Sequence, residues 1–110
     1  MLVNLGSLAV VGKVFADGAM VENLKALKVA DGVIEITVRT GGCTEKDHFR
    51  TETVSTSGVN EITFFRTTPD KCKGFFPNGK MISFTLEDLH MDAADSSVVI
   101  TNSISLSRRD

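Results

Sequence analysis

Hydrophobic and polar residues alternate with a period of two along most of the chain from residue 24 onward. Between residues 32 and 40, Ile34, Ile36 and Val38 alternate with polar side chains. Successive side chains of a β-strand point to opposite faces, so this pattern predicts a strand that is buried on one face only. Such half-buried strands are typical of antiparallel sheets.

The dipeptide Asp31-Gly32 separates this strand from an apolar run at residues 24–30. Asp-Gly between two apolar runs is a strong hairpin signal, because both central residues of the tight turn need a positive φ. The sequence therefore predicts a second strand over residues 24–30 that pairs with the first. The alternative for this region is a short helix over residues 19–28, with its apolar residues on one side.

Further alternating segments follow at short spacing, and glycine-containing turns separate them. The additional strands are expected at residues 48–56, 59–66, 82–86 and 98–106. Asn102 interrupts the apolar face of the last segment, which indicates a bulge or a change of sheet there. Six or seven short strands with such turns predict an all-β fold, an antiparallel β-sandwich with a small barrel as the alternative.

Length and composition limit the classes of function. A chain of 110 residues is expected to form a single domain, residues 1–110. The net charge of −2 argues against a dedicated nucleic-acid binder, which usually carries a strong basic excess. The chain has no Trp and no Tyr, and this weakens carbohydrate and single-stranded nucleic-acid binding, which depend on aromatic stacking.

Residues 1–16 form an apolar stretch whose end, Val14-Phe15-Ala16, resembles the small-residue cleavage site of a secretory signal. The stretch has no basic residues at its beginning, and Lys13 interrupts its end. It is also too short to span a bilayer. We therefore expect either a remnant of a signal segment or an ordinary first strand, and no membrane span.

Cys43 and Cys72 follow turn-like segments at the ends of predicted strands. A disulfide between them would enclose the predicted hairpin of residues 48–66 in a loop of about 30 residues, which contributes roughly 3–4 kcal/mol in the chain-entropy model. Such a bond indicates an oxidising compartment, so we expect a periplasmic or secreted protein; the alternative is a cytoplasmic protein with two free thiols. No catalytic thiol is expected, because neither cysteine lies in a Cys-x-x-Cys motif or opens a helix.

The segment most typical of a binding site is residues 71–80, KCKGFFPNGK. Two adjacent Phe cannot both point inward from an extended chain, so one of them is expected to form an exposed apolar anchor for a protein partner. The lysines around them would steer an acidic partner. The expected partner-binding residues are Phe75, Phe76, Lys71, Lys73 and Lys80. The alternative is that one Phe plugs the open end of the sandwich.

A metal site is the main candidate for catalysis. His90 and Asp92 are two positions apart and would share a face of a strand, and His48 could complete a two-His-one-carboxylate site. The same residues also fit an acidic surface loop, and no ligand spacing here is a strong metal signature. We therefore expect no catalytic residue and no cofactor, and a non-enzymatic interaction module. The alternatives are a metal-dependent enzyme using these three residues and a structural subunit that assembles by sheet-edge pairing.

Overall fold

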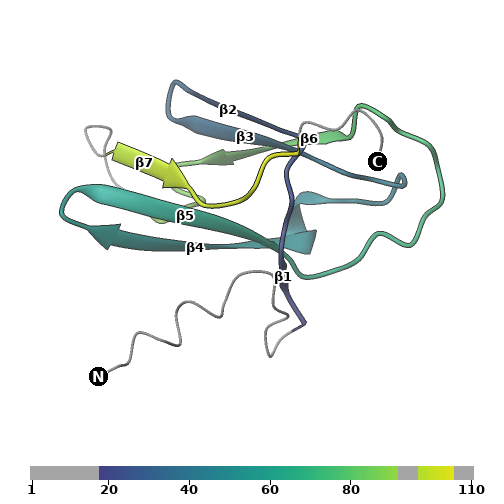
Figure 1. Cartoon of the computed structure of the whole chain (residues 1–110), viewed down its shortest axis with the longest axis horizontal. Coiled ribbons are helices and arrows are strands. Elements are labelled where there is room, and N and C mark those ends of the chain that lie inside the picture. Colours follow the sequence, from purple (N-terminus) through teal and green to yellow (C-terminus); the bar gives the residue numbers. More distant parts are fainter. Residues whose placement is uncertain (1–17, 92–96, 106–110) are drawn as a thin grey trace.

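The computed structural model describes residues 18–91 and 97–105. Within these residues, seven strands form two sheets that pack face to face and do not close into a barrel (Figure 1). The predicted all-β sandwich is therefore confirmed, and the barrel alternative is wrong. The elements are β1 (Met20–Val21), β2 (Ala26–Ala30), β3 (Val33–Val38), the 3-10 helix η1 (Lys46–His48), β4 (Phe49–Thr56), β5 (Val59–Arg66), β6 (Lys80–Thr85) and β7 (Ser97–Ile100).

The two sheets differ in how their strands pair. The smaller sheet has the order β2-β3-β6, and its pairings are antiparallel. In the larger sheet β5 is central, with β4 antiparallel along one side. Along the other side, β7 runs parallel to the beginning of β5 and β1 runs antiparallel to its end. The pairing of β7 is thus the exception to the antiparallel arrangement that the alternation indicated.

Both predicted hairpins form around residues with positive φ. Asp31 has a φ of 54° and Gly32 of 76°, and β2 pairs antiparallel with β3 as expected. The turn between β4 and β5 has the same form, with φ of 52° at Ser57 and 83° at Gly58. These are the tight turns whose twist matches that of the strands. The helix considered for residues 19–28 is wrong, because β1 and β2 occupy this region.

The core lies between the two sheets and is built from the inward-facing residues of the alternating strands. Its buried members are Leu24, Ile34, Ile36, Val38, Phe49, Ile62, Phe64, Ile82, Phe84 and Leu89. The rings of Phe64 and Phe84 meet across the sandwich with their centroids 5.0 Å apart. Phe65 faces away from this core, and the guanidinium carbon of Arg50 lies 4.5 Å from its ring centroid.

The chain leaves β6 one residue earlier than predicted. Leu86 lies in a turn, where its carbonyl accepts hydrogen bonds from the amides of Leu89 (3.1 Å) and Met91 (2.9 Å). This turn brings Leu89 into the core and Asp88 to 2.8 Å from the ammonium of Lys46. The hydrogen bond from Lys46, followed by the amide of Thr85, lowers the pKa of Asp88 to about 2.

Asn102 is buried beside β5, just beyond the end of β7. Its Oδ1 accepts a hydrogen bond from the Phe64 amide (2.9 Å), and its Nδ2 donates to the carbonyls of Phe64 (2.8 Å) and Glu22 (2.7 Å). The side-chain amide thereby makes hydrogen bonds to β5 of the kind that a backbone peptide group would make, at the position between β7 and β1. The following residues pair with Leu24 instead of β5, so the predicted interruption at Asn102 is confirmed. The segment 1–16, Asp92 and Leu106 lie outside the described residues.

Candidate functional site: a stapled loop at one end of the sandwich

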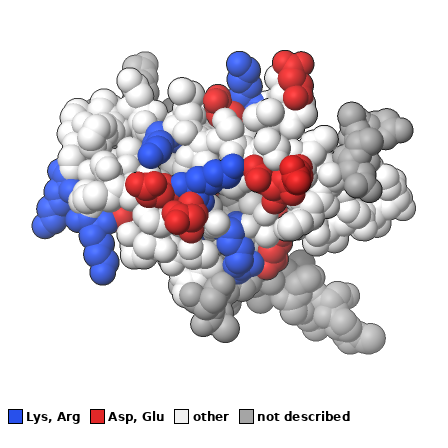
Figure 2. Space-filling model, turned by 180° about the vertical axis from the view of Figure 1, so that it is seen from behind, with Lys and Arg blue, Asp and Glu red and all other residues white. Residues whose placement is uncertain are grey.

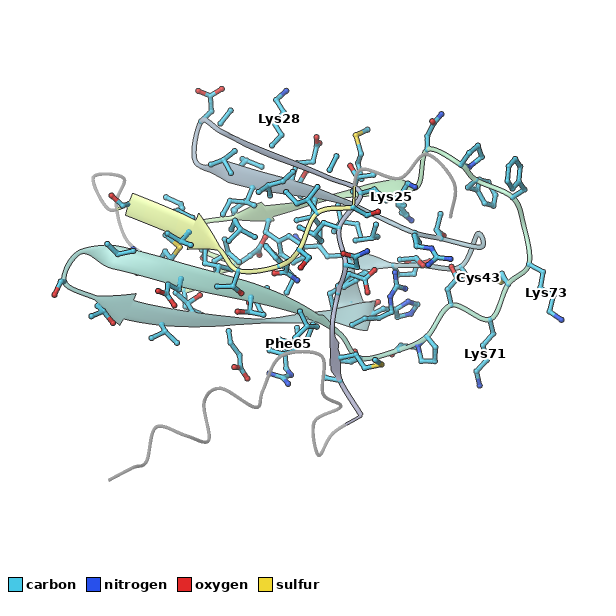
Figure 3. The ribbon with its side chains drawn as sticks, in the orientation of Figure 1. Lys25, Lys28, Cys43, Phe65, Lys71 and Lys73 are labelled. Atoms are coloured by element: carbon cyan, nitrogen blue, oxygen red, sulfur yellow. A yellow bond between two sulfur atoms is a disulfide. The ribbon has the colours of Figure 1, made fainter. Side chains whose placement is uncertain are left out.

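Two connections between the sheets meet at one end of the molecule (Figure 1). Residues 39–45 lead from β3 to η1 and β4, and residues 67–79 lead from β5 to β6. A disulfide joins the two connections through Cys43 and Cys72, whose Cα atoms are 5.7 Å apart, and this confirms the predicted pairing (Figure 3). The spacing is usual for a disulfide. The bond encloses the β4–β5 hairpin and fixes the base of the segment that carries both phenylalanines.

The carboxylate of Asp70 forms a second link between the same two connections. Its Oδ1 accepts a hydrogen bond from the amide of Cys72 at 2.9 Å. The donors to its Oδ2 are Thr40 Oγ1 (3.0 Å), the amide of Gly41 (2.8 Å), the amide of Cys43 (3.1 Å) and Thr44 Oγ1 (2.6 Å). We call Asp70 and these partners the Asp70 cluster. Hydrogen bonds to an ionised acceptor are among the stronger ones in proteins, so the cluster holds the two connections together independently of the disulfide.

The Asp70 cluster should make stability depend on pH. The hydrogen bond from Thr44, with those from the amides of Gly41, Cys72 and Cys43, holds the pKa of the Asp70 carboxyl well below its usual range. A carboxyl whose pKa is depressed by folding contributes stability above its unfolded pKa of about 3.9, and this contribution disappears as the pH falls below that value. We therefore expect Asp70→Asn to lose less stability than the wild type between neutral and acidic pH, as measured by urea unfolding at a series of pH values.

The matched control for this measurement is Glu61→Gln, which removes an exposed carboxylate of β5. Its unfolding free energy should follow the wild-type pH profile. A profile of Asp70→Asn that parallels the wild type down to strongly acidic pH would contradict the assignment.

Gly41 allows the two connections to touch through their backbones. A Cβ atom at this position would lie 2.0 Å from the carbonyl oxygen of Cys72, which is far inside van der Waals contact. On the other side of this contact, the amide of Gly74 donates to the carbonyl of Gly41 at 2.8 Å. A side chain at position 41 would therefore separate the connections that the disulfide and Asp70 join.

An ion pair lies at the base of the site, between the last residue of β5 and the residue that follows β1. Arg66 donates through Nε and Nη2 to the two carboxylate oxygens of Glu22, at 3.0 and 2.8 Å, and both side chains are largely buried. It also donates to Thr44 Oγ1 (3.1 Å) and to the carbonyl of Arg39 (2.9 Å). A cleft of about 620 Å³ lies beside this pair. The two acidic side chains in its wall, Glu22 and Asp70, already form the ion pair and the hydrogen bonds described above. Neither of them is therefore available as a free acid or base.

The segment of residues 71–80, called the tip loop below, presents both phenylalanines outward. Phe75 is 87 % exposed and Phe76 is 50 % exposed. The ring of Phe76 rests on two glycines: a Cβ atom at Gly42 or Gly74 would lie 3.1 or 2.5 Å from its Cε2. Neither ring enters the core, so the alternative that one of them plugs the end of the sandwich is wrong.

The three lysines of the tip loop have different surroundings. Lys71 and Lys73 are exposed and point away from the sandwich at the end that carries Cys43 (Figure 3). Figure 2 shows basic side chains gathered at the same end of the molecule, seen from behind. Lys80 instead donates from Nζ to the carbonyl of Thr44 at 2.9 Å. Lys80 thus supports the base of the loop, while Lys71 and Lys73 leave its outer surface basic.

The structure describes two of the three metal-site residues considered from the sequence, His48 and His90. His48 Nδ1 accepts a hydrogen bond from the amide of Glu45 (3.1 Å) in the cap of η1. His90 is exposed in the turn after β6, and Asp92 is outside the described residues. Among residues 18–91 and 97–105, the group with metal-ligand spacing is Cys43, Asp70 and Cys72, whose sulfurs form the disulfide. A site formed by the two histidines and Asp92 stays a prediction.

Asp70 is one of the residues of this site that the sequence did not reveal. The neighbouring residues give one indication of its role, because Asp70 follows Pro69 and comes two positions before Cys72. Aspartate in such a turn accepts a hydrogen bond from the amide two residues on, as Asp70 does. Its other donors lie 26 to 30 positions earlier in the chain, where no local pattern points to them.

Comparison with known proteins gives no relative: no family model, no curated protein and no solved structure matches the chain. Residues 18–91 and 97–105 contain no helix with the length and apolar character needed to cross a membrane. The tip loop is the exposed basic and aromatic segment at this end of the all-β scaffold.

Proposed function

We propose that the protein is a non-enzymatic binding module that engages an acidic partner through the tip loop. The observation that carries this proposal is the 87 % exposure of Phe75 on a loop held by a disulfide. Large apolar side chains that protrude from rigid loops act as anchors at interfaces. Because the loop is already ordered, binding costs less conformational entropy than it would for a flexible segment.

Charge supports the choice of an acidic partner. Residues 71–80 contain three lysines and no acidic residue, in a chain whose net charge is −2. Lys71 and Lys73 are exposed, and their side chains point away from the sandwich (Figure 3). A local basic surface raises the rate of encounter with an acidic one and disfavours basic partners.

The disulfide also supports an extracytoplasmic location, periplasmic or secreted. Both cysteine residues are exposed. Exposed disulfides are readily reached by the thiol reductants of the cytosol, whereas oxidising compartments preserve them. Direct thiol alkylation of protein taken from its native compartment tests this: a bridged pair supports the location, and two free thiols would refute it.

The binding role is tested by the double variant Phe75→Ser/Phe76→Ser. We expect it to lose the partners that the wild type retains when immobilised protein is exposed to an extract of its native source. Loss of two anchor rings should reduce affinity at least tenfold, since hot-spot truncations cost about 2 kcal/mol or more. Thermal unfolding should be unchanged, because neither ring contributes to the core.

The matched control is Val54→Ser, which removes an apolar side chain that is 58 % exposed on β4, away from the tip loop. It should retain every partner. If the double variant retains all partners at wild-type levels, the tip loop is not the contact and the proposal is wrong.

A further inference from the structure

We infer that the acidic partner is the surface of a lipid bilayer that carries anionic headgroups. In this arrangement Phe75 and Phe76 enter the interface between headgroups and acyl chains, while Lys71 and Lys73 contact the headgroups. The inference rests on the proposed function and names the class of partner for the same site.

The position of the two rings favours a bilayer. The tip loop lies at one end of the longest axis of the molecule (Figure 1), and Phe75 and Phe76 are 87 % and 50 % exposed there. A specific protein interface needs roughly 800 Å² of complementary surface on each partner. A bilayer accepts a narrow apolar projection without complementary shape, because its interface is fluid and binding depends on the apolar area buried.

Residue types point the same way. Protein interfaces are enriched in aromatic residues, Phe included, and in Arg, whereas lysine is depleted there. The cations of the tip loop are all lysines, with no Arg among residues 71–80. Apolar residues next to lysines are typical of peripheral membrane contacts, where anionic lipids attract each nearby cation.

The loop is also held on both sides of its two rings. Cys72 and the Asp70 cluster fix its base. A turn closes its outer end, with the amide of Gly79 donating to the carbonyl of Phe76 at 3.0 Å and Gly79 at a φ of 73°. The flexible lysine stems let the ammonium groups stay among the headgroups while the rings lie deeper.

The test uses a tryptophan reporter, since the wild-type chain has no Trp. Phe75→Trp keeps a large aromatic residue at the tip, and its fluorescence should shift to the blue with vesicles of phosphatidylcholine and phosphatidylglycerol. The shift should be absent with phosphatidylcholine alone and should weaken as salt is added. Val54→Trp, on an exposed position of β4 away from the loop, should show no shift.

Vesicle co-sedimentation then separates the contributions to binding. Lys73→Gln should weaken binding about fivefold and Lys71→Gln/Lys73→Gln about 25-fold. Phe76→Ala should weaken it roughly tenfold through lost apolar burial. Lys28→Gln, which removes the same charge from β2 at another place on the surface (Figure 3), should leave binding within twofold of the wild type.

The lipid assignment is overturned if anionic vesicles neither bind the protein nor shift the reporter, or if binding ignores the tip-loop variants. A soluble protein captured by the wild type and lost with Phe75→Ser/Phe76→Ser, without vesicle binding, overturns the lipid assignment but supports the proposed function. Failure of both kinds of binding overturns both.

Discussion

Replacing Cys43 and Cys72 together with alanine is expected to lower the free energy of unfolding by about 3–4 kcal/mol and the melting temperature by roughly 15 °C. The disulfide joins residues 29 positions apart, and its loss frees the unfolded chain to explore many more conformations. The enclosed hairpin keeps the core contacts of Phe49, Ile62 and Phe64 without the bond. The expected loss therefore comes from the greater freedom of the unfolded chain.

Urea unfolding of the double variant and of the reduced wild type checks this expectation. The two should agree, because both remove the same covalent link. Circular dichroism in the absence of urea should still show the native sheets, since the Asp70 cluster continues to join the two connections. A loss below about 1 kcal/mol would show that the unfolded chain is already restricted without the bond.

Asn102→Leu is expected to cost about 2–5 kcal/mol, because it leaves two backbone groups without partners. The Phe64 amide loses its acceptor and the Glu22 carbonyl loses its donor. The carbonyl of Phe64 keeps a hydrogen bond from the Glu22 amide at 3.0 Å. Leucine and asparagine are similar in size, so the loss should reflect the unpaired polar groups more than a cavity.

Urea unfolding is again the measurement, with Asn23→Leu as the control. Asn23 is exposed, so its replacement should change stability by less than about 0.5 kcal/mol. Asn102→Asp keeps an acceptor for the Phe64 amide but no longer donates to the two carbonyls. An Asn102→Leu variant as stable as the control would show that water satisfies these groups and that the side chain is replaceable.

Local patterns were sufficient to predict the strands and the hairpin turns. Alternation in β3 reflects a single buried face, and that face is set by the strand itself. Asp31-Gly32 and Ser57-Gly58 form tight turns because their residues tolerate positive φ. Such features depend on neighbours in sequence, and a single sequence displays them directly.

Features that depend on distant partners were not predictable in the same way. Alternation places β7 in a sheet but does not give its neighbour or direction, and its parallel pairing with β5 requires a long crossover. The ion pair between Arg66 and Glu22 joins residues 44 positions apart. Charged residues of this kind look like ordinary surface residues until the fold brings them together.

The tip loop shows a third limit of prediction from the sequence, which concerns the exposure of side chains outside strands. The expectation that only one phenylalanine would be exposed came from strand geometry, in which neighbouring side chains point to opposite faces. Residues 71–79 do not form a strand, so that constraint does not apply. Gly42 and Gly74 instead give the ring of Phe76 a surface to lie on, outside the core. The disulfide was predictable as a pair because the chain has two cysteines.

The contact between Asn102 and Glu22 also sets when the protein can finish folding during its synthesis. It spans 80 positions, and it secures β1 against the sheet only after the last part of the described chain is available. The β2–β3 and β4–β5 hairpins close between near neighbours and can form early. Until Asn102 has left the ribosome, one side of β5 lacks its partners and stays open to pairing with other chains. A nascent chain of this protein is therefore expected to need protection by a chaperone, or prompt transfer through an export channel, until Asn102 has emerged.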